Sequence, residues 1–291
     1  MKSPAILASF ILTSALLAQS RQETTGPKPV YRPGSTTQAP TNNAPDIERF
    51  LKIRAPNSPA LAADGTLYVR DWPDGIQQLY KRAADAPIDG PMTKLTNFKD
   101  GVAGYSLSPD SKHIVIAAAV GGNEQNQLYH FDPGTGDIKP LLQNPSVVYS
   151  LQCWLHDSSG FIFTANDESS ADFYIYRYDF AGDKITKLLG KSGEWSAADI
   201  TADGTHLLVS HYTSASKSDA FQLTPAISDL TLLNIAPGDF VNSPFAYLPG
   251  EQSVAILSDK DQGIPRLFVR DLTSGNITKP LPDLDPYPIE G

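Results

Sequence analysis

The sequence repeats one short turn motif at a nearly constant interval. Five turns align, and their middle positions are separated by 46, 47, 46 and 46 residues: Ala63-Asp64-Gly65, Pro109-Asp110-Ser111, His156-Asp157-Ser158, Ala202-Asp203-Gly204 and Leu248-Pro249-Gly250. A second set of segments begins at Leu79, Leu128, Ile175, Ala220 and Leu267, at intervals of 49, 47, 45 and 47 residues. Two independent anchors with one period of about 47 residues indicate five copies of a unit the size of a propeller blade.

Each copy reads as four short strands separated by turns. In the second copy we expect strands at 103–107, 114–119, 127–132 and 138–142, divided by turn residues such as Pro109 and Gly136. The second strand of each copy is a continuous apolar run, which is typical of a strand buried on both faces. Stacked blades bury their sheets in this way, whereas a β-sandwich would not require a fixed period.

The predicted fold is therefore all-β, a β-propeller of four-stranded antiparallel blades. We expect about five blades within a domain at 46–291. The predicted blades lie at about 58–101, 102–147, 148–194, 195–239 and 240–291.

The N-terminal residues have the pattern of an exported protein. Residues 1–20 are predicted to be a signal peptide, because Lys2 precedes the apolar run 5–17, which is shorter than the roughly 20 residues of a stable membrane span. An uncleaved membrane anchor is the alternative. Residues 21–45 are rich in Gln, Thr, Pro, Ser and Asn, which favours a disordered linker. We therefore predict a periplasmic or extracellular protein with no stable membrane span after cleavage.

The charge balance limits the classes of partner. The chain has 23 Lys and Arg residues against 32 Asp and Glu residues, a formal net charge of −9, and no basic cluster. Nucleic acids and anionic membranes attract basic surfaces, so neither is expected as a partner.

The sequence contains no recognisable catalytic or metal-binding motif. It lacks Gly-x-Ser-x-Gly, His206 and His211 fall on opposite faces of a strand, and the stretch at Asp259 lacks the ligands of a calcium loop. The expected inner strands contribute one carboxylate, Asp199, which is too few for a central ion site. The single cysteine, Cys153, is expected to be a buried structural thiol. We predict no catalytic residue, no cofactor and no metal site.

The loops between second and third strands are the most polar parts of the repeats. Their acidic residues are Glu124, Asp167, Glu168, Asp172, Asp219, Asp259 and Asp261. Binding residues are often carried on loops, so these seven are candidates for a rim that faces a substrate or partner. Ordinary solvated loops are the alternative interpretation.

The repeats resemble those of known propellers. The stretch 108–116, together with 127–132, is similar to the Ser-Pro-Asp-Gly repeat shared by TolB and the prolyl oligopeptidase family of serine peptidases. Three further stretches, at 47–59, 121–129 and 171–176, resemble the N-terminal propeller of secreted bacterial acylaminoacyl- or dipeptidyl-peptidase-like members. The resemblance implies seven or eight blades followed by an α/β-hydrolase domain with Ser, Asp and His. The chain has only five repeats, and it contains no position that matches a catalytic residue of that family.

Two functions follow from this resemblance. The first is the non-catalytic propeller portion of a secreted peptidase, which restricts and orients peptide access to a hydrolase domain absent from this chain. The alternative is a stand-alone TolB-like periplasmic propeller that binds or organises other proteins. The expected partner is thus a hydrolase domain or a peptide or protein ligand. We also expect an incomplete ring whose end blades expose an apolar face, because the end repeats are as apolar as the internal ones.

Overall fold

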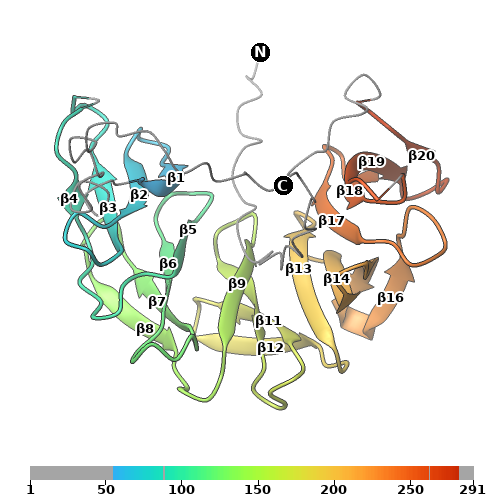
Figure 1. The fold of residues 1–291 in the computed structure, drawn as a ribbon, viewed down its shortest axis with the longest axis horizontal. Helices are drawn as coiled ribbons and strands as arrows, with labels where there is room; N and C mark the ends of the chain where they lie inside the picture. Colours follow the sequence, from blue (N-terminus) through green and yellow to red (C-terminus); the bar gives the residue numbers. More distant parts are fainter. Residues whose placement is uncertain (1–54, 88, 262, 282–291) are drawn as a thin grey trace, which may run out of the picture. The chain divides into compact units, whose positions relative to one another are not determined.

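The part of the chain that the structure describes forms twenty short strands, which pair as five four-stranded antiparallel sheets. The computed structural model describes residues 55–281 except 88 and 262, so the predicted signal peptide (1–20) and linker (21–45) lie outside the described residues. Within every sheet the strands are hydrogen-bonded in sequence order, so each sheet is a simple meander. The described residues confirm the all-β propeller of about five blades (Figure 1).

The five sheets are named blades 1 to 5 along the chain. Blade 1 contains β1 (Asn57–Leu61), β2 (Leu67–Asp71), β3 (Gln78–Arg82) and β4 (Thr93–Lys94). Blade 2 contains β5 (Gly104–Leu107), β6 (Ile114–Ala118), β7 (Gln127–Phe131) and β8 (Ile138–Leu142). Blade 3 contains β9 (Tyr149–Trp154), β10 (Gly160–Ala165), β11 (Tyr174–Asp179) and β12 (Lys184–Leu189). Blade 4 contains β13 (Glu194–Ile200), β14 (Leu207–Ser214), β15 (Lys217–Thr224), the short 3-10 helix η1 (Pro225–Ile227) and β16 (Asp229–Leu232). Blade 5 contains β17 (Asn242–Tyr247), β18 (Ser253–Ser258), β19 (Arg266–Asp271) and β20 (Ile277–Thr278).

The repeated turn between the first and second strands is built by an aspartate. The carboxylate of Asp110 accepts the backbone N–H of Lys112 at 3.0 Å, and Asp203 accepts that of Thr205 at 2.9 Å. Such bonds from Asp to the backbone two residues on stabilise a local turn. The residue after the aspartate then has a positive φ, as Ser111 does at 62°. This local chemistry explains why the motif could be found in the sequence.

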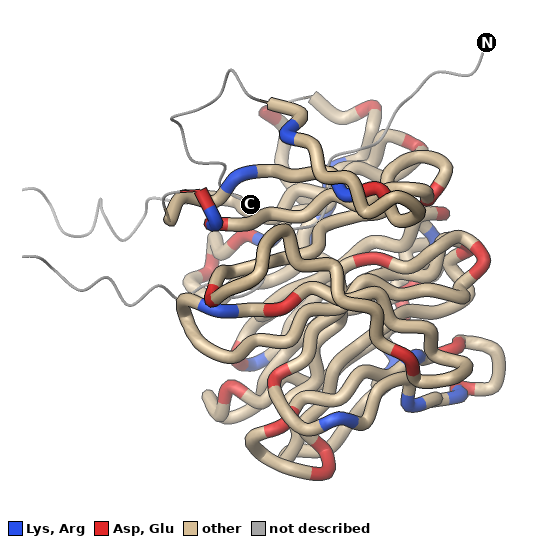
Figure 2. Tube along the Cα trace, turned by 90° about the vertical axis from the view of Figure 1, so that its right-hand side faces the viewer, with Lys and Arg blue, Asp and Glu red and all other residues tan. Residues whose placement is uncertain are grey.

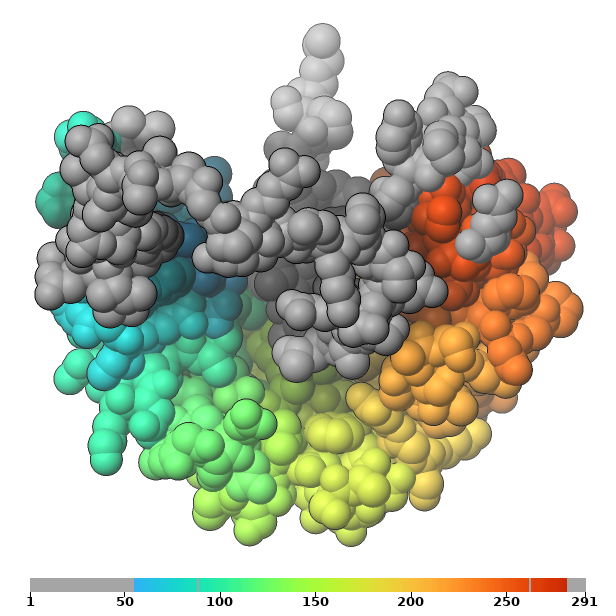
Figure 3. All heavy atoms as spheres, viewed as in Figure 1, coloured from blue at the N-terminus to red at the C-terminus, as the bar shows by residue number. Residues whose placement is uncertain are grey.

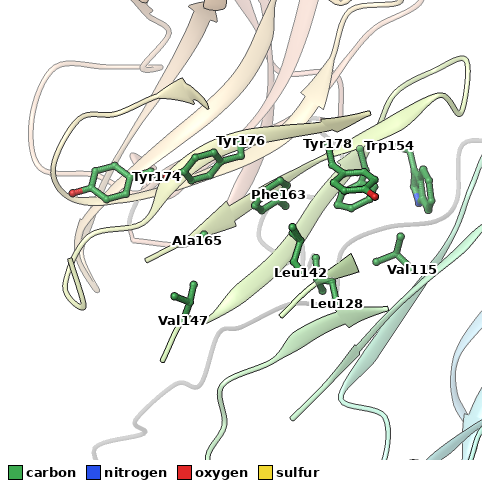
Figure 4. Packing of buried hydrophobic residues seen from close by; sticks show 11 residues of the cluster. Val115, Leu128, Leu142, Val147, Trp154, Phe163, Ala165, Tyr174, Tyr176 and Tyr178 are labelled. Carbon is green, nitrogen blue, oxygen red and sulfur yellow. The ribbon is translucent and has the colours of Figure 1, made fainter. Parts of the chain in front are cut away.

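Neighbouring blades pack through alternate side chains of each strand. In β11, Tyr176 and Tyr178 face blade 2 and join a cluster with Leu128, whereas Ile175 faces blade 4 and packs with Leu207. Figure 4 shows the tyrosines of β11 on the same side as Phe163 and opposite Leu128 and Leu142. Each internal sheet packs apolar side chains against a neighbouring sheet on both of its faces. Figure 3 shows the blades side by side in chain order.

The second strands confirm the prediction of burial on both faces. All six residues of β10 are buried, and in β6 the consecutive residues Ile114, Val115 and Ile116 are at most 1% exposed. A strand with one wet face would alternate instead.

The two end blades differ in the burial of their outward faces. In blade 1, Val69 and Tyr80 alternate with the residues that face blade 2, yet both are only 4% exposed. In blade 5, Leu257, Leu267 and Val269 alternate with the residues that face blade 4 and are half-buried. The outward face of blade 5 thus meets in part the expectation of an exposed apolar face, and the incomplete ring remains a prediction.

The meander places two kinds of connection on opposite ends of every blade. Turns between first and second strands and between third and fourth strands lie at one end, here named the turn rim. Loops between second and third strands and the connections between blades lie at the other end, the loop rim. In Figure 1 the first strands β5, β9, β13 and β17 lie on the inner side of the array, and the fourth strands lie outside.

Candidate interaction site

Six of the seven predicted acidic residues lie in loops of the loop rim. Glu124 lies in the β6–β7 loop, and the other five divide between the β10–β11 and β18–β19 loops: Asp167, Glu168, Asp172, Asp259 and Asp261. Figure 2 shows acidic residues spread over the loops and turns of the array. The meander therefore brings these six residues to one end of their blades, although nothing gathers them into one cluster.

Asp219 does not lie in a loop, and its predicted placement is wrong. Only two residues, Ala215 and Ser216, separate β14 from β15, so the ladder extends further than we expected and pairs Asp219 with His211. The Asp219 carboxylate accepts the side-chain amide of Asn234 at 2.6 Å. Asp219 is thus a strand residue that fastens the connection between blades 4 and 5.

The β10–β11 loop is held by its own carboxylates. The hydroxyl of Tyr176 donates to Asp167 at 2.7 Å, and the ammonium of Lys187 lies 2.5 Å from Glu168. The same ammonium lies 4.6 Å from the ring centroid of Tyr174, within the range of a cation–π contact. Burial, and then the bond to Asp167, raises the pKa of Tyr176, so this hydroxyl remains a hydrogen-bond donor.

The remaining acidic residues of the loop rim make similar local bonds. Asp172 accepts the backbone N–H of Gly193 at 2.6 Å, and this bond is the main cause of its lowered pKa. Asp259 accepts the backbone N–H of Val241 at 2.8 Å. These two bonds each join a β–β loop to a connection between blades.

Asp261 and Glu124 complete the set. Asp261 lies 2.9 Å from the ammonium of Lys279 and 3.0 Å from that of Lys260, and these contacts lower its pKa. Glu124 is exposed, has a φ of 58°, and has no bonding partner among the residues that the structure describes. The loop-rim carboxylates therefore mainly order the loops, and Glu124 is the one that remains available to a partner.

A set of hydrogen bonds joins the blades at the turn rim. In each case the positive-φ residue of one turn accepts a backbone N–H from the turn of the preceding blade. The three bonds are Ala63 N to Ser111 Oγ at 3.1 Å, Asp110 N to Ser158 Oγ at 3.1 Å, and Ala202 N to Glu251 Oε1 at 2.7 Å. At the joint between blades 3 and 4 the equivalent residue is Gly204, which has no side chain to accept. The turn hydrogen bonds place Glu251, and not the aligned Gly250, at this position, so the alignment of the fifth turn in the sequence is wrong by one residue. The sequence signal for the open joint is the alignment of Gly204 with Ser111 and Ser158.

A second set of bonds joins the inner strands. The indole of Trp154 donates to Ser106 Oγ at 2.5 Å, and the backbone N–H of Ala197 donates to Gln152 Oε1 at 3.0 Å. The backbone N–H of Tyr247 donates to Asp199 Oδ2 at 2.8 Å. Burial raises the pKa of Asp199, the inner-strand carboxylate noted in the sequence, and its bonds to backbone amides give it a structural role.

The inner strands carry a further carboxylate that the sequence analysis missed. Glu194 is the first residue of β13, and its side chain is exposed. His206 and His211 point to different neighbours: His206 bonds to Thr205, whereas His211 stacks on Trp195 with ring centroids 4.5 Å apart.

The joint between blades 3 and 4 contains a cavity of about 550 Å³, a depression that is open to solvent next to Gly204. A smaller depression of about 300 Å³ lies at the joint between blades 4 and 5, where it is lined by Asp203, His206 and Glu251. The pKa of Asp203 is lowered to about 2, chiefly by the backbone N–H of Thr205.

Three further features bear on metal binding, thiol chemistry and membrane insertion. Among residues 55–281, with 88 and 262 left out, no three His, Cys, Asp or Glu side chains are grouped to hold a metal ion. Burial raises the pKa of the Cys153 thiol, which keeps it protonated at neutral pH. No helix in the same part of the chain is long and apolar enough to cross a bilayer.

Comparison with curated proteins finds similarity to TolB proteins. No family model matches the chain. The chain is 25% identical over 190 residues to the Tol-Pal system protein TolB of Francisella tularensis subsp. tularensis strain WY96-3418, which covers 64% of this chain and 42% of that protein. TolB of strain LVS of subsp. holarctica is 24% identical over 190 residues. The chain thus spans less than half the length of these relatives.

Similar solved structures include TolB proteins and hydrolases. TolB from Acinetobacter baumannii superposes with a TM-score of 0.53 and 22% identity, covering 75% of this chain and 52% of that one. A puromycin hydrolase superposes with a TM-score of 0.62 and 16% identity, covering 78% of this chain and 37% of that one. A structure from a study of two prolyl endopeptidases has a TM-score of 0.59 and 18% identity, covering 78% and 36%. At these identities the likeness concerns the fold.

Proposed function

We propose that this chain, a TolB-like β-propeller, is exported and acts as a non-catalytic module that binds a protein or peptide partner. The observation that carries the proposal is the sequence similarity over 190 residues to proteins of the Tol-Pal system. Their name assigns these relatives to the Tol-Pal system, and we propose a Pal-type protein as the partner of this chain.

The loop rim is the surface that we assign to the partner. Bonds such as Tyr176 to Asp167 and Gly193 to Asp172 order its loops before any ligand arrives. A preordered surface loses less conformational entropy on binding than a mobile one. Glu124, exposed on this rim, adds negative charge that would attract a basic patch on the partner.

The N-terminal pattern supports export. Lys2 followed by the apolar run 5–17 is typical of a secretory signal peptide, and this part of the chain lies outside the described residues. N-terminal sequencing of the protein recovered from the soluble extracytoplasmic fraction tests this step. An intact Met1 would contradict cleavage.

Isothermal titration calorimetry with the purified Pal protein of the source organism tests the proposed function. We expect saturable binding that Glu124→Lys weakens by about threefold to tenfold, because rim charges contribute modestly to affinity. Asp85→Lys is the matched control, since Asp85 is an exposed acidic residue of a third-to-fourth strand turn at the turn rim. No binding, or equal weakening by both variants, would contradict the proposal.

A second function, the propeller portion of a secreted peptidase, rests on a different observation. The stretches at 47–59, 121–129 and 171–176 resemble such peptidases. In that role the loop or turn rim would restrict peptide access to a separately encoded hydrolase domain. The DNA directly downstream distinguishes the two functions, because a hydrolase frame with Gly-x-Ser-x-Gly favours the second and its absence favours the first. In either role the purified chain should hydrolyse no acyl-peptide, and turnover that is sensitive to a serine-directed inhibitor and survives purification would contradict both.

A further inference from the structure

The cavity at the joint between blades 3 and 4 combines charged and apolar walls. Blade 3 contributes Arg177 and Asp179 from β11 and Lys184 from β12, all on the face toward blade 4. Blade 4 contributes Gly204 from its first turn and the buried aliphatic side chain of Ile200. The cavity has a volume of about 550 Å³ and is open to solvent on one side, so it can admit only part of a ligand.

The cavity lies where the other joints carry a side chain. Ser111, Ser158 and Glu251 hold the equivalent position at three joints, and each accepts a hydrogen bond from the preceding turn. Backbone conformation does not require glycine here, because Ser111 and Ser158 adopt φ values of 62° and 61° against 71° for Gly204. Space does not require it either, since the nearest atom to a Cβ on Gly204 would be Arg177 Nη1 at 3.7 Å. Gly204 therefore leaves open a position that a serine could close.

Arg177 is held so that one end of its guanidinium faces this opening. Its Nε and Nη2 atoms lie 2.8 and 2.6 Å from Asp179 Oδ1, which fixes the plane of the group. Its Nη1 atom is the atom nearest to the missing side chain of Gly204, and no described residue accepts a hydrogen bond from it. A fixed guanidinium with a free N–H₂ edge is well suited to bind an oxygen anion.

The residues that line the cavity carry a net charge of +1 from Arg177, Lys184 and Asp179, and Asp157 nearby offsets part of it. The ammonium of Lys184 has no ion-pair partner in the described part of the chain, whereas Asp179 is paired with Arg177. Asp157 also lies in the field of Arg177: hydrogen bonds from Ser159 lower its pKa first, and the positive charge of Arg177 adds to the effect. Two cations and one paired carboxylate line the cavity itself.

The next joint shows which chemical group this position accepts. At the joint between blades 4 and 5, the carboxylate of Glu251, which two methylene groups join to the backbone, accepts a hydrogen bond from the backbone N–H of Ala202 at 2.7 Å. The equivalent donor at the open joint is the backbone N–H of His156, for which the described residues provide no acceptor. We propose that the cavity binds a carboxylate on a short aliphatic chain, with its oxygens on Arg177 Nη1 and Lys184 and its methylene groups against the partly buried Leu188. This site is independent of the partner proposed for the loop rim.

Nuclear magnetic resonance titration with glutarate tests the site. We expect saturable shifts of backbone amides in residues 177–186 and 200–206, with a dissociation constant of about 1 mM. Glutaramide, which lacks the charge, is expected to cause no saturable shift. The absence of saturable shifts up to about 20 mM glutarate, or shifts centred elsewhere in the chain, would overturn the proposal.

Two variants and one control locate the binding. Arg177→Gln removes the guanidinium, and Gly204→Ser places a hydroxyl in the opening; each should weaken glutarate binding by about tenfold or more. Ser158→Gly is the control, because it creates an open turn at the joint between blades 2 and 3, where His130 and not an arginine holds the matching strand position, and it should leave binding unchanged. Spectra of the free variants report whether each is folded. Unchanged affinity in a folded Gly204→Ser protein would overturn the assignment.

A capped tripeptide Ala-Glu-Ala distinguishes the source of the carboxylate. Tighter binding of this peptide than of glutarate, lost when Glu is replaced by Gln, would identify an acidic side chain of a polypeptide as the ligand. Binding of glutarate alone would identify a free small carboxylate. Binding of neither probe would overturn the proposal.

Discussion

Replacing Ser158 by alanine should lower the free energy of unfolding by about 1 kcal/mol. The Ser158 side chain is 3% exposed, and its hydroxyl accepts the backbone N–H of Asp110 from the preceding blade at 3.1 Å. A hydrogen bond of this kind contributes about 0.5–1.5 kcal/mol net, and Asp110 is exposed enough for water to replace part of the lost bond.

Replacing Ser158 by glycine separates the bond from the backbone strain. Ser158 has a φ of 61°, and a side chain in this left-handed region costs about 1 kcal/mol that glycine avoids. The glycine variant loses the same bond but relieves this strain, so its stability should stay close to that of the parent. We therefore expect Ser158→Ala to be clearly less stable than Ser158→Gly.

Urea denaturation measures both variants. The transition midpoint should fall for Ser158→Ala at an unchanged slope, and the thermal midpoint should fall by about 2–4 °C for a domain of this size. Equal destabilisation by alanine and glycine would show that the bond alone matters. An alanine variant as stable as the parent would refute the assigned role of the turn-rim bonds.

Three further outcomes follow from other joints. Gly204→Ser should leave the free energy of unfolding within about 1 kcal/mol of the parent, because a new bond to the preceding turn offsets the strain of a positive φ; a larger loss in urea denaturation would show that the joint cannot close. Trp154→Phe should lower the same quantity by about 2–3 kcal/mol, because it removes ring volume from the core and the bond to Ser106, and a loss below about 0.5 kcal/mol would contradict this. Burial, and then the charge of His113, lowers the pKa of His130 in the folded protein, so the unfolded chain binds more protons. The free energy of unfolding should therefore fall as the pH drops below about 6.5. His130→Gln should reduce the slope of the urea midpoint against pH between pH 5 and pH 7, and an unchanged slope would contradict this.

The strands could be predicted because their signals are local. The strands expected at 103–107, 114–119, 127–132 and 138–142 match β5 to β8 within one residue at each end. Each boundary depends on a turn formed by residues within a few positions, such as the Asp110 carboxylate and the backbone of Lys112. The period of about 47 residues then allowed the strands predicted for this blade to be transferred to the other four repeats.

The candidate site could be predicted only in part because its bonds join distant residues. The sequence placed Asp167 and Asp172 in a loop, but their partners Tyr176 and Gly193 are chosen by the packing of strands and connections. We expected Asp219 in the loop between the second and third strands of blade 4, but that loop contains only residues 215 and 216, so Asp219 lies in β15.

The bonds between blades require two repeats to be compared at once. Gly204 aligns with Ser111 and Ser158 in the sequence. The missing hydrogen bond at Gly204 is recognised only when the bonds accepted by Ser111, Ser158 and Glu251 at the other joints are known. The guanidinium of Arg177, which lies next to it, comes from another blade and gives no signal in the turn motif.

Site-specific photo-crosslinking in living cells tests the proposed binding function most directly. A crosslinking amino acid at position 124 reports on the loop rim, and the same amino acid at position 85 reports on the turn rim. We expect an adduct with Pal, identified by mass spectrometry, from position 124 and none from position 85. Adducts at neither position, or equal adducts at both, would contradict a partner-binding loop rim.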